Sequence, residues 1–248
     1  MFDEGTGSPI VFIPGIQGRW EWMAPALHQI AKRCRAISYS LHGRTFDDLI
    51  AEVDATLDRA RLRSAALCGV SFGGMVAMQY AALRPERATA LIIVSTPGPG
   101  WRPSPTQARY IAKPWISTPA FVGTAWSRLG PEIIAAIDGW PERIAFCAQY
   151  GLRIATAPSV PPQMAARSTL CHEIDLSAAC TRITAPALVI TGEPQLDRVV
   201  PTESTRRYTH LIKRAKYVMI ERTGHNGLIT RPDYFARIVS EFVNANRS

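Results

Sequence analysis

The sequence contains few cysteines and no long apolar run. No segment approaches the ~18 consecutive apolar residues of a membrane span. The N-terminus starts acidic and has only a four-residue apolar run, so no signal peptide is visible. The five cysteines are odd in number and scattered, without the spacing of metal ligands. We therefore expect a cytoplasmic protein with reduced, mostly buried cysteines and no metal site.

Acidic residues are also in the minority, with 20 against 28 basic ones and a formal net charge of +8. The densest basic run spans residues 206–216. Its simplest interpretation is the solvated face of a helix with Tyr208, Leu211 and Ile212 turned inwards. A nucleic-acid surface is the alternative, but no recognisable binding module accompanies the run. We expect a small-molecule substrate, and neither a nucleic acid nor a membrane as partner; the oligomeric state stays open.

The most informative motif that is present is Gly69-Val70-Ser71-Phe72-Gly73, which reads as Gly-x-Ser-x-Gly. An apolar run (65–68) precedes it and a helical pattern (75–83) follows it. A strand, a tight turn and a helix in this order are what a nucleophile elbow requires. The turn holds its serine in a sparsely populated backbone conformation, and the glycines avoid clashes with the neighbouring strand and helix. We therefore predict that Ser71 is a nucleophile at a helix N-terminus, where negative charge is favoured.

A serine nucleophile needs a base. Of the five histidines, His225 is the candidate, because it lies on a glycine-flanked loop after the apolar run 217–220. From the end of a strand, such a side chain can reach over the sheet edge toward the elbow. The alternative is a loop histidine without a special role. His42 also follows a strand-like run, but it precedes the serine, and we interpret it as part of the floor of the site.

The base in turn needs an acid to orient it. Two carboxylates, Glu193 and Asp197, follow the apolar run 187–190 on one loop. Asp197 is the first choice, because two valines and a proline that suit the start of the next helix come soon after it. Glu193 lies closer to the strand end and stays as the alternative; both could also be solvated loop carboxylates. The chain order Ser71, Asp197, His225 is the one expected for a triad on this elbow.

With these motifs the chain resembles the α/β-hydrolase family of the Ser-Asp-His kind, in its esterase, lactonase and carbon–carbon hydrolase branch. The resemblance covers essentially the whole chain, including the run 10–13 and the following loop Pro14-Gly15-Ile16-Gln17-Gly18. It implies an α/β fold with a mostly parallel, twisted sheet flanked by helices. It also implies an oxyanion hole formed by the backbone N–H groups of Ile16 and Phe72, and no cofactor. Each such donor is worth about 3 kcal/mol in measured cases.

The sequence departs from the family pattern near its start. The first loop begins with Pro14-Gly15, where relatives usually have His-Gly, and this concerns loop geometry more than chemistry. The chain also starts almost at its first apolar run, so we expect a sheet that is shortened at its N-terminal edge. A serine at position 71 instead of an aspartate argues against the haloalkane dehalogenase and epoxide hydrolase branches.

Strand and helix patterns alternate in two parts of the chain, residues 1–96 and 183–248, which we assign to the α/β core. Short apolar runs predict strands covered on both faces, at 10–13, 36–39, 65–68, 90–94, 187–190 and 217–220. Helical patterns predict helices at 20–32, 47–60, 72–83, 201–213 and 232–244.

Residues 97–182 differ from the core. They contain 11 of the 19 prolines and four of the six tryptophans, their apolar residues recur with helical spacing, and no clear strand is visible. Because proline suits the first turn of a helix, we predict a helical lid inserted into the core. Trp20 and Trp22 follow the oxyanion loop directly, so we expect at least one of them to wall the site, with Trp20 as the first choice. Trp126 in this lid is a further candidate to line a substrate pocket. The alternative is that these side chains only attach short helices to the core.

The function predicted from the motifs and the resemblance is two-step acyl transfer through an acyl-enzyme on Ser71. A small or medium carboxylic ester or lactone is the first-choice substrate. The alternative is cleavage of a carbon–carbon bond in a ring-cleavage diketone, since Ser71-Phe72-Gly73-Gly74-Met75 resembles elbows of that branch. A slow-turnover ligand receptor with the hydrolase fold and a thioesterase for carrier-bound acyl chains also stay open.

Overall fold

The computed structural model describes residues 1–246, and its centre is a seven-stranded sheet in the order β1-β3-β2-β4-β5-β6-β7. Neighbouring strands are parallel except β1, which pairs antiparallel with β3. The strands are β1 (Phe2–Glu4), β2 (Pro9–Ile13), β3 (Arg35–Ser38), β4 (Ala65–Val70), β5 (Ala88–Val94), β6 (Ala187–Thr191) and β7 (Ala215–Met219). The predicted, mostly parallel sheet is confirmed, and its N-terminal edge is a single three-residue antiparallel strand.

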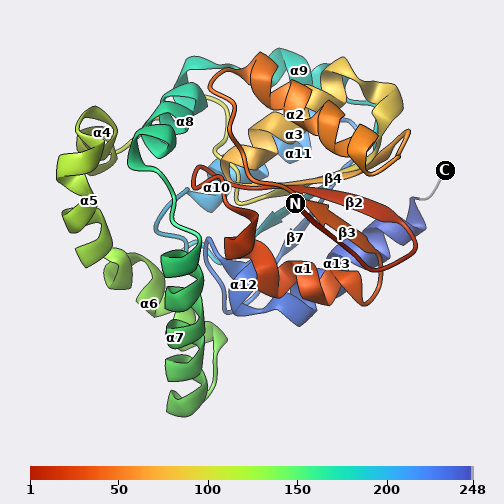
Figure 1. Cartoon of the computed structure of the whole chain (residues 1–248). Coiled ribbons are helices and arrows are strands. Elements are labelled where there is room, and N and C mark those ends of the chain that lie inside the picture. Colours follow the sequence, from red (N-terminus) through yellow and green to blue (C-terminus); the bar gives the residue numbers. More distant parts are fainter. Residues whose placement is uncertain (247–248) are drawn as a thin grey trace.

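Helices cover both faces of the sheet (Figure 1). One face carries α1 (Ala24–Ala31), α12 (Gly227–Thr230) and α13 (Pro232–Ala245). The other carries α2 (Phe46–Arg59), α3 (Phe72–Leu83), α9 (Ser177–Arg182) and α11 (Tyr208–Leu211). Successive strand residues point to opposite faces, so Val11 and Ile13 join one buried cluster while Ile10 and Phe12 join the other. Coverage on both faces explains why the strands are continuous apolar runs.

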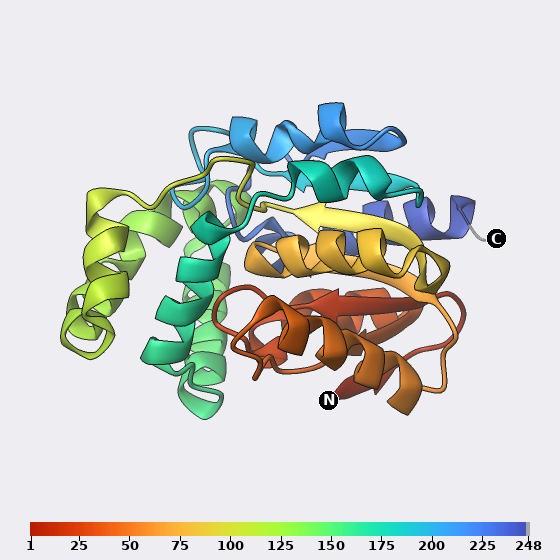
Figure 2. The same cartoon turned by 90° about the horizontal axis from the view of Figure 1, so that it is seen from above.

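A helical insertion leaves the core between β5 and β6. It consists of α4 (Pro105–Ala112), α5 (Pro114–Gly123), α6 (Ala125–Ala136), α7 (Trp140–Thr156) and α8 (Pro161–Glu173). Prolines open four of these helices, α4, α5, α7 and α8, as the proline-rich composition predicts. Figure 2 shows the insertion beyond the arrowheads of the parallel strands, which is the edge where the loops of an α/β sheet form sites.

Helix α9 lies inside the predicted lid range of residues 97–182, but it packs with the core. It contacts α3, and its Ala179 and Cys180 belong to a buried cluster of the core. The sequence pattern could not separate this helix from the lid, because both are helical. None of the five cysteines forms a disulfide, and Cys147 is the exposed one. Within residues 1–246, no helix combines the length and the apolar character needed to cross a membrane.

Two predicted helices are divided in the structure. The range 20–32 becomes a 3-10 turn, η1 (Trp20–Met23), followed by α1, which begins where Pro25 can occupy a first-turn position. The range 201–213 becomes α10 (Thr202–Arg206) and α11. A second short 3-10 helix, η2 (Pro85–Arg87), follows α3. Strand β1 was missed because it has no apolar run: only Phe2 of its three residues is buried.

Candidate active site

Ser71 sits at a sharp turn between β4 and α3. Its backbone angles are φ 53° and ψ −121°, a conformation that residues other than glycine rarely adopt. Its N–H donates to the carbonyl of Val94 on β5 at 2.7 Å, which ties the turn to the sheet. A methyl group at Gly69 would overlap the backbone of Gly73, and one at Gly73 would overlap the carbonyl of Ile13. The two glycines of the motif are therefore needed for strand, helix and loop to approach this closely.

The loop after β2 lies directly against the serine. A Cβ atom at Gly15 would be 3.4 Å from the Cβ of Ser71. The loop closes as a turn in which Gly18 N–H donates to the Gly15 carbonyl at 2.9 Å. Ile16 lies within this turn, and Phe72 is the first residue of α3, a position whose N–H has no acceptor inside the helix. Both residues predicted to form an oxyanion hole thus lie on segments adjacent to Ser71.

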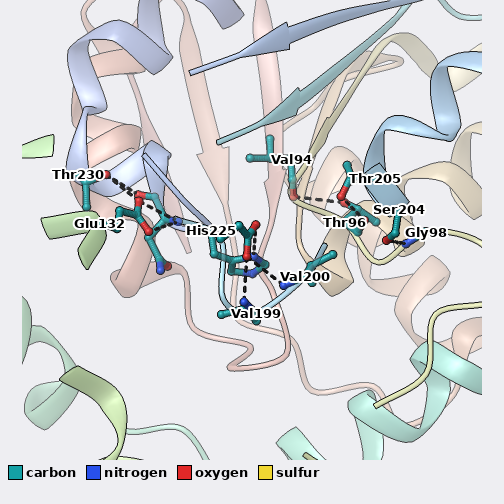
Figure 3. A network of polar contacts seen from close by, with 12 residues as sticks. Val94, Thr96, Gly98, Glu132, Val199, Val200, Ser204, Thr205, His225 and Thr230 are labelled. Atoms are coloured by element: carbon teal, nitrogen blue, oxygen red, sulfur yellow. Dashed lines mark hydrogen bonds and ion pairs between the residues drawn. The ribbon is translucent and has the colours of Figure 1, made fainter. Parts of the chain in front are cut away.

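Asp197 and His225 are in direct contact. Nδ1 of His225 lies 3.2 Å from Oδ2 of Asp197, and both side chains are buried, with 10% and 1% of their surfaces exposed. The other oxygen of Asp197 accepts the N–H groups of Val199 and Val200 at 3.0 and 2.9 Å. Val199 and Val200 are labelled close to His225 in Figure 3. These bonds hold the carboxylate in one orientation, so it can fix the ring of His225.

Close packing of two glycine loops brings this pair together. A methyl group at Gly192 would overlap the carbonyls of Thr223 and Gly224, and one at Gly224 would overlap the carbonyl of Leu196. The alternative acid, Glu193, faces elsewhere on the same loop. Its Oε1 accepts the N–H of Arg222 at 2.7 Å, and its other oxygen accepts from Gln195. The structure therefore brings Asp197, and not Glu193, to His225.

The electrostatic surroundings of His225 favour its protonated form. Burial by itself disfavours the imidazolium, but three effects together outweigh burial and raise the pKa of His225 above its ordinary value of 6.5. These are the charge of Asp197, the hydrogen bond to it, and the charge of Glu132 on α6. A base with a raised pKa accepts a proton readily when a nucleophile releases one.

Ser71 and His225 line one small cleft between the core and the insertion. The insertion contributes Tyr150 from α7, and the core contributes Trp22, whose Nε1 donates to the Ala157 carbonyl at 2.9 Å. The cleft holds about 30 Å³, which is room for one or two waters. It is lined by Gly15, Gln17, Arg19, Trp22, Met23, Val70, Ser71, Tyr150, His225, Asn226, Leu228 and Ile229.

The two tryptophans proposed for the pocket lie outside this lining. Trp20 packs against Phe2, with ring centroids 5.4 Å apart, and Trp126 on α6 is 54% exposed. Trp22, two residues after Trp20, lines the cleft in its place. The 3-10 turn at 20–23 has three residues per turn instead of 3.6. Its side chains therefore face other directions than those of the predicted α-helix.

Sequence reasoning also missed two buried charged side chains of the insertion. Glu132 on α6 accepts the N–H of Asn226, the residue after His225, at 3.1 Å (Figure 3). Arg167 on α8 donates to the Ile16 carbonyl at 2.9 Å and to the Leu41 carbonyl at 2.6 Å. Single charged residues in helical patterns give no local signal for such contacts. Among the described side chains, no group of three or more His, Cys, Asp or Glu residues is placed to hold a metal ion.

Comparisons with known proteins identify the family and the fold. The sequence profile of the alpha/beta hydrolase family matches residues 10–238. The pimeloyl-[acyl-carrier protein] methyl ester esterase of Aeromonas hydrophila is 27% identical over 271 residues, covering 96% of each chain. Polyketide synthase ThaQ of Burkholderia thailandensis is 24% identical over 272 residues, which cover 97% of this chain but only 12% of ThaQ. The enol-lactonase of Burkholderia xenovorans LB400 has the same fold, with a TM-score of 0.80 at 20% identity over 98% of this chain and 95% of that one.

Proposed function

We propose, since this chain belongs to the alpha/beta hydrolase family, that it hydrolyses a small-to-medium carboxylic ester or lactone through an acyl-enzyme on Ser71. One observation carries the proposal. The strained Ser71 and the buried His225 line the same cleft, and Asp197 contacts the His225 ring. A strained serine next to an oriented base is the arrangement that nucleophilic acyl transfer uses.

In the proposed reaction, His225 takes the proton from the Ser71 hydroxyl as its oxygen attacks the carbonyl carbon. Asp197 binds Nδ1 and so leaves Nε2 to take this proton, and it stabilises the imidazolium that forms. The N–H groups of Ile16 and Phe72 donate to the oxyanion of the tetrahedral intermediate. His225 then returns the proton to the leaving alcohol, and a water molecule releases the acyl group by the same steps.

The substrate class is supported by the names of the similar proteins. One relative is a methyl ester esterase, and a protein of the same fold is an enol-lactonase. Both reactions begin with attack on an ester carbonyl, which is the chemistry that this site can perform without a further group. The helical insertion supplies one wall of the cleft through Tyr150. We therefore infer that it acts as a lid whose shape limits the size of the acyl group.

The test combines active-site labelling with turnover. A fluorophosphonate probe is applied to the wild type, Ser71→Ala, His225→Ala and the control Glu193→Gln. Hydrolysis of p-nitrophenyl esters of increasing chain length and of simple lactones is measured in parallel. We expect labelling and turnover in the wild type and in Glu193→Gln, and their loss in the other two variants. Absence of labelling in the folded wild type would overturn the proposed function.

A second candidate function is hydrolysis of a carbon–carbon bond in a diketone that bears a carboxylate. Arg19 favours it, because this cation lines the same cleft as Ser71 and its buried Nε has no partner among the described residues, while its Nη2 pairs with Glu21. A guanidinium with a free N–H can hold a carboxylate. Labelling without ester or lactone turnover, together with cleavage of a ring-cleavage diketone, would favour this reaction over ester hydrolysis. Labelling without turnover of either substrate class would favour a slow ligand receptor.

A further inference from the structure

Glu132 is a second deeply buried carboxylate next to the histidine loop. Only 1% of the residue is exposed, although it belongs to the insertion and not to the core. Both of its carboxylate oxygens lie 3.1 Å from the N–H of Asn226, and Oε1 also accepts from the hydroxyl of Thr230 at 2.9 Å. Figure 3 shows this carboxylate between Thr230 and His225. It therefore holds the chain directly after His225 and the helix α12 that follows.

A buried carboxylate needs compensation, because its charge is poorly solvated inside a protein. Burial is the largest effect and raises the pKa of Glu132 above its ordinary value, although the amides of Asn226 and Gly224, the hydroxyl of Thr230 and the charge of His225 oppose it. No described lysine or arginine forms an ion pair with it. The cation that faces Glu132 is thus the protonated form of His225, which exists only for part of the proposed reaction.

The other charged groups around the histidine loop are already paired or neutral. Burial keeps Tyr150 on α7 neutral by raising its pKa. Arg222 pairs with Asp138 on the exposed side of the loop, and Arg19 in the cleft pairs with Glu21. Asp197 and Glu132 are consequently the two carboxylates that act on the imidazole.

We propose that Glu132 is a positioning residue for His225: it anchors the histidine loop to the lid and supplies a second negative charge that favours the imidazolium. This rests on the proposed function, in which His225 is the base. Glu132 touches neither substrate nor the reacting atoms, and it acts through the loop and through its charge. The lid therefore contributes to proton transfer as well as to the wall of the cleft.

The test compares Glu132→Gln with Glu193→Gln. Both variants replace a carboxylate that accepts a backbone N–H near this site, but only Glu132 faces His225. The midpoint of His225 protonation is measured by NMR on histidine-labelled protein, with the signal assigned from His225→Ala. The pH profile of kcat/KM is measured with a p-nitrophenyl ester. Removing the negative charge of Glu132 removes stabilisation of the imidazolium, so both midpoints are expected to move to lower pH.

The expected pattern for Glu132→Gln also includes a lower plateau kcat with KM nearly unchanged, since the substrate wall is intact. Glu193→Gln should match the wild type. An unchanged His225 midpoint in folded Glu132→Gln overturns the proposal. Wild type that is neither labelled nor active would overturn the proposed function instead, and the NMR titration, which needs no activity, would still decide the role of Glu132.

Thermal unfolding shows whether Glu132→Gln folds. If it does not, the titration is made in Asp197→Asn, where Glu132 is the remaining carboxylate beside the imidazole. A His225 that can still be protonated supports the proposal. A ring that stays neutral throughout the pH range in which this variant is folded overturns it, because burial alone then governs the imidazole.

Discussion

The sheet core and the helical lid differ in what they bury. Every residue of β4 and of β6 is buried, whereas α4, α5 and α7 contain no buried residue along their described lengths. Large apolar side chains of the lid face solvent, with Ile116 at 78% and Trp115 at 65% exposed. The core therefore gains its stability from buried apolar area, and the lid has little such area of its own.

Two of the side chains that the lid does bury are charged, and both reach the candidate active site. Glu132 contacts the histidine loop, and Arg167 contacts the loop that contains Ile16. A buried charge is costly unless it is hydrogen-bonded. These two side chains therefore favour the one position of the lid in which their hydrogen bonds form. Most of the buried apolar side chains thus belong to the core, while the lid meets the loops of the candidate site through a few polar contacts.

The largest expected effect is that of a core residue, Ser71→Ala. Without the hydroxyl there is no acyl-enzyme, so kcat/KM for p-nitrophenyl esters should fall at least about a thousandfold. The midpoint of thermal unfolding should stay close to that of the wild type, because alanine changes the side chain of this partly buried residue by a single oxygen. Substantial ester turnover in this variant would show that another group performs the chemistry.

The second largest effect is expected for Arg167, a residue of the lid. Arg167→Met leaves the carbonyls of Ile16 and Leu41 without their donor, at about 1–3 kcal/mol for each buried group. We expect lower stability and a fall in kcat of about tenfold or more, since 1.4 kcal/mol in the barrier is a factor of ten. The matched control is Arg109→Met on the exposed surface of α4. If both variants behave alike in urea unfolding and in turnover, the distinction between buried and exposed lid charges is wrong.

A smaller effect is expected at the boundary between core and lid. Trp22→Ala removes a cleft wall and the hydrogen bond to Ala157. KM for a p-nitrophenyl ester should therefore rise about tenfold, because the substrate loses ~1.5 kcal/mol of apolar contact. Trp20→Ala should change KM much less, because Trp20 packs against Phe2. Steady-state kinetics of both variants measure the two KM values. A larger change in Trp20→Ala would show that Trp20, and not Trp22, contacts the substrate.

The smallest effect is one of pH on the wild type. The pKa of His225 is raised, so the base is protonated over a wider acid range than free imidazole. The pH profile of kcat/KM should fall toward acid with a midpoint above 6.5. A raised pKa also means that the free energy of unfolding gains from this group at low pH and loses that gain as pH rises through the folded pKa. A midpoint at or below 6.5 would contradict both statements.

Much of the fold follows from local patterns. The boundaries of α3 agree with the prediction to the residue, because the motif around Ser71 marks its start and Arg84-Pro85 marks its end. The predicted pairing of Asp197 with His225 is also found as a contact, and its catalytic role stays a prediction. The choice of Trp22 over Trp20 and the division of the range 20–32 were not predicted, because a 3-10 turn has three residues per turn instead of 3.6 and so changes which side chain faces the site.

The sequence by itself determined the α/β class, the elbow and the chain order of the candidate triad, since periodicity and turn glycines are properties of short segments. Only the tertiary structure decided which carboxylate meets His225 and that Glu132 and Arg167 reach the loops of the core. The bond from Asn226 to Glu132 joins residues 94 positions apart, and that from Arg167 to Ile16 joins residues 151 apart. Contacts over such separations depend on how the lid packs against the sheet, and packing leaves no signal in a local pattern.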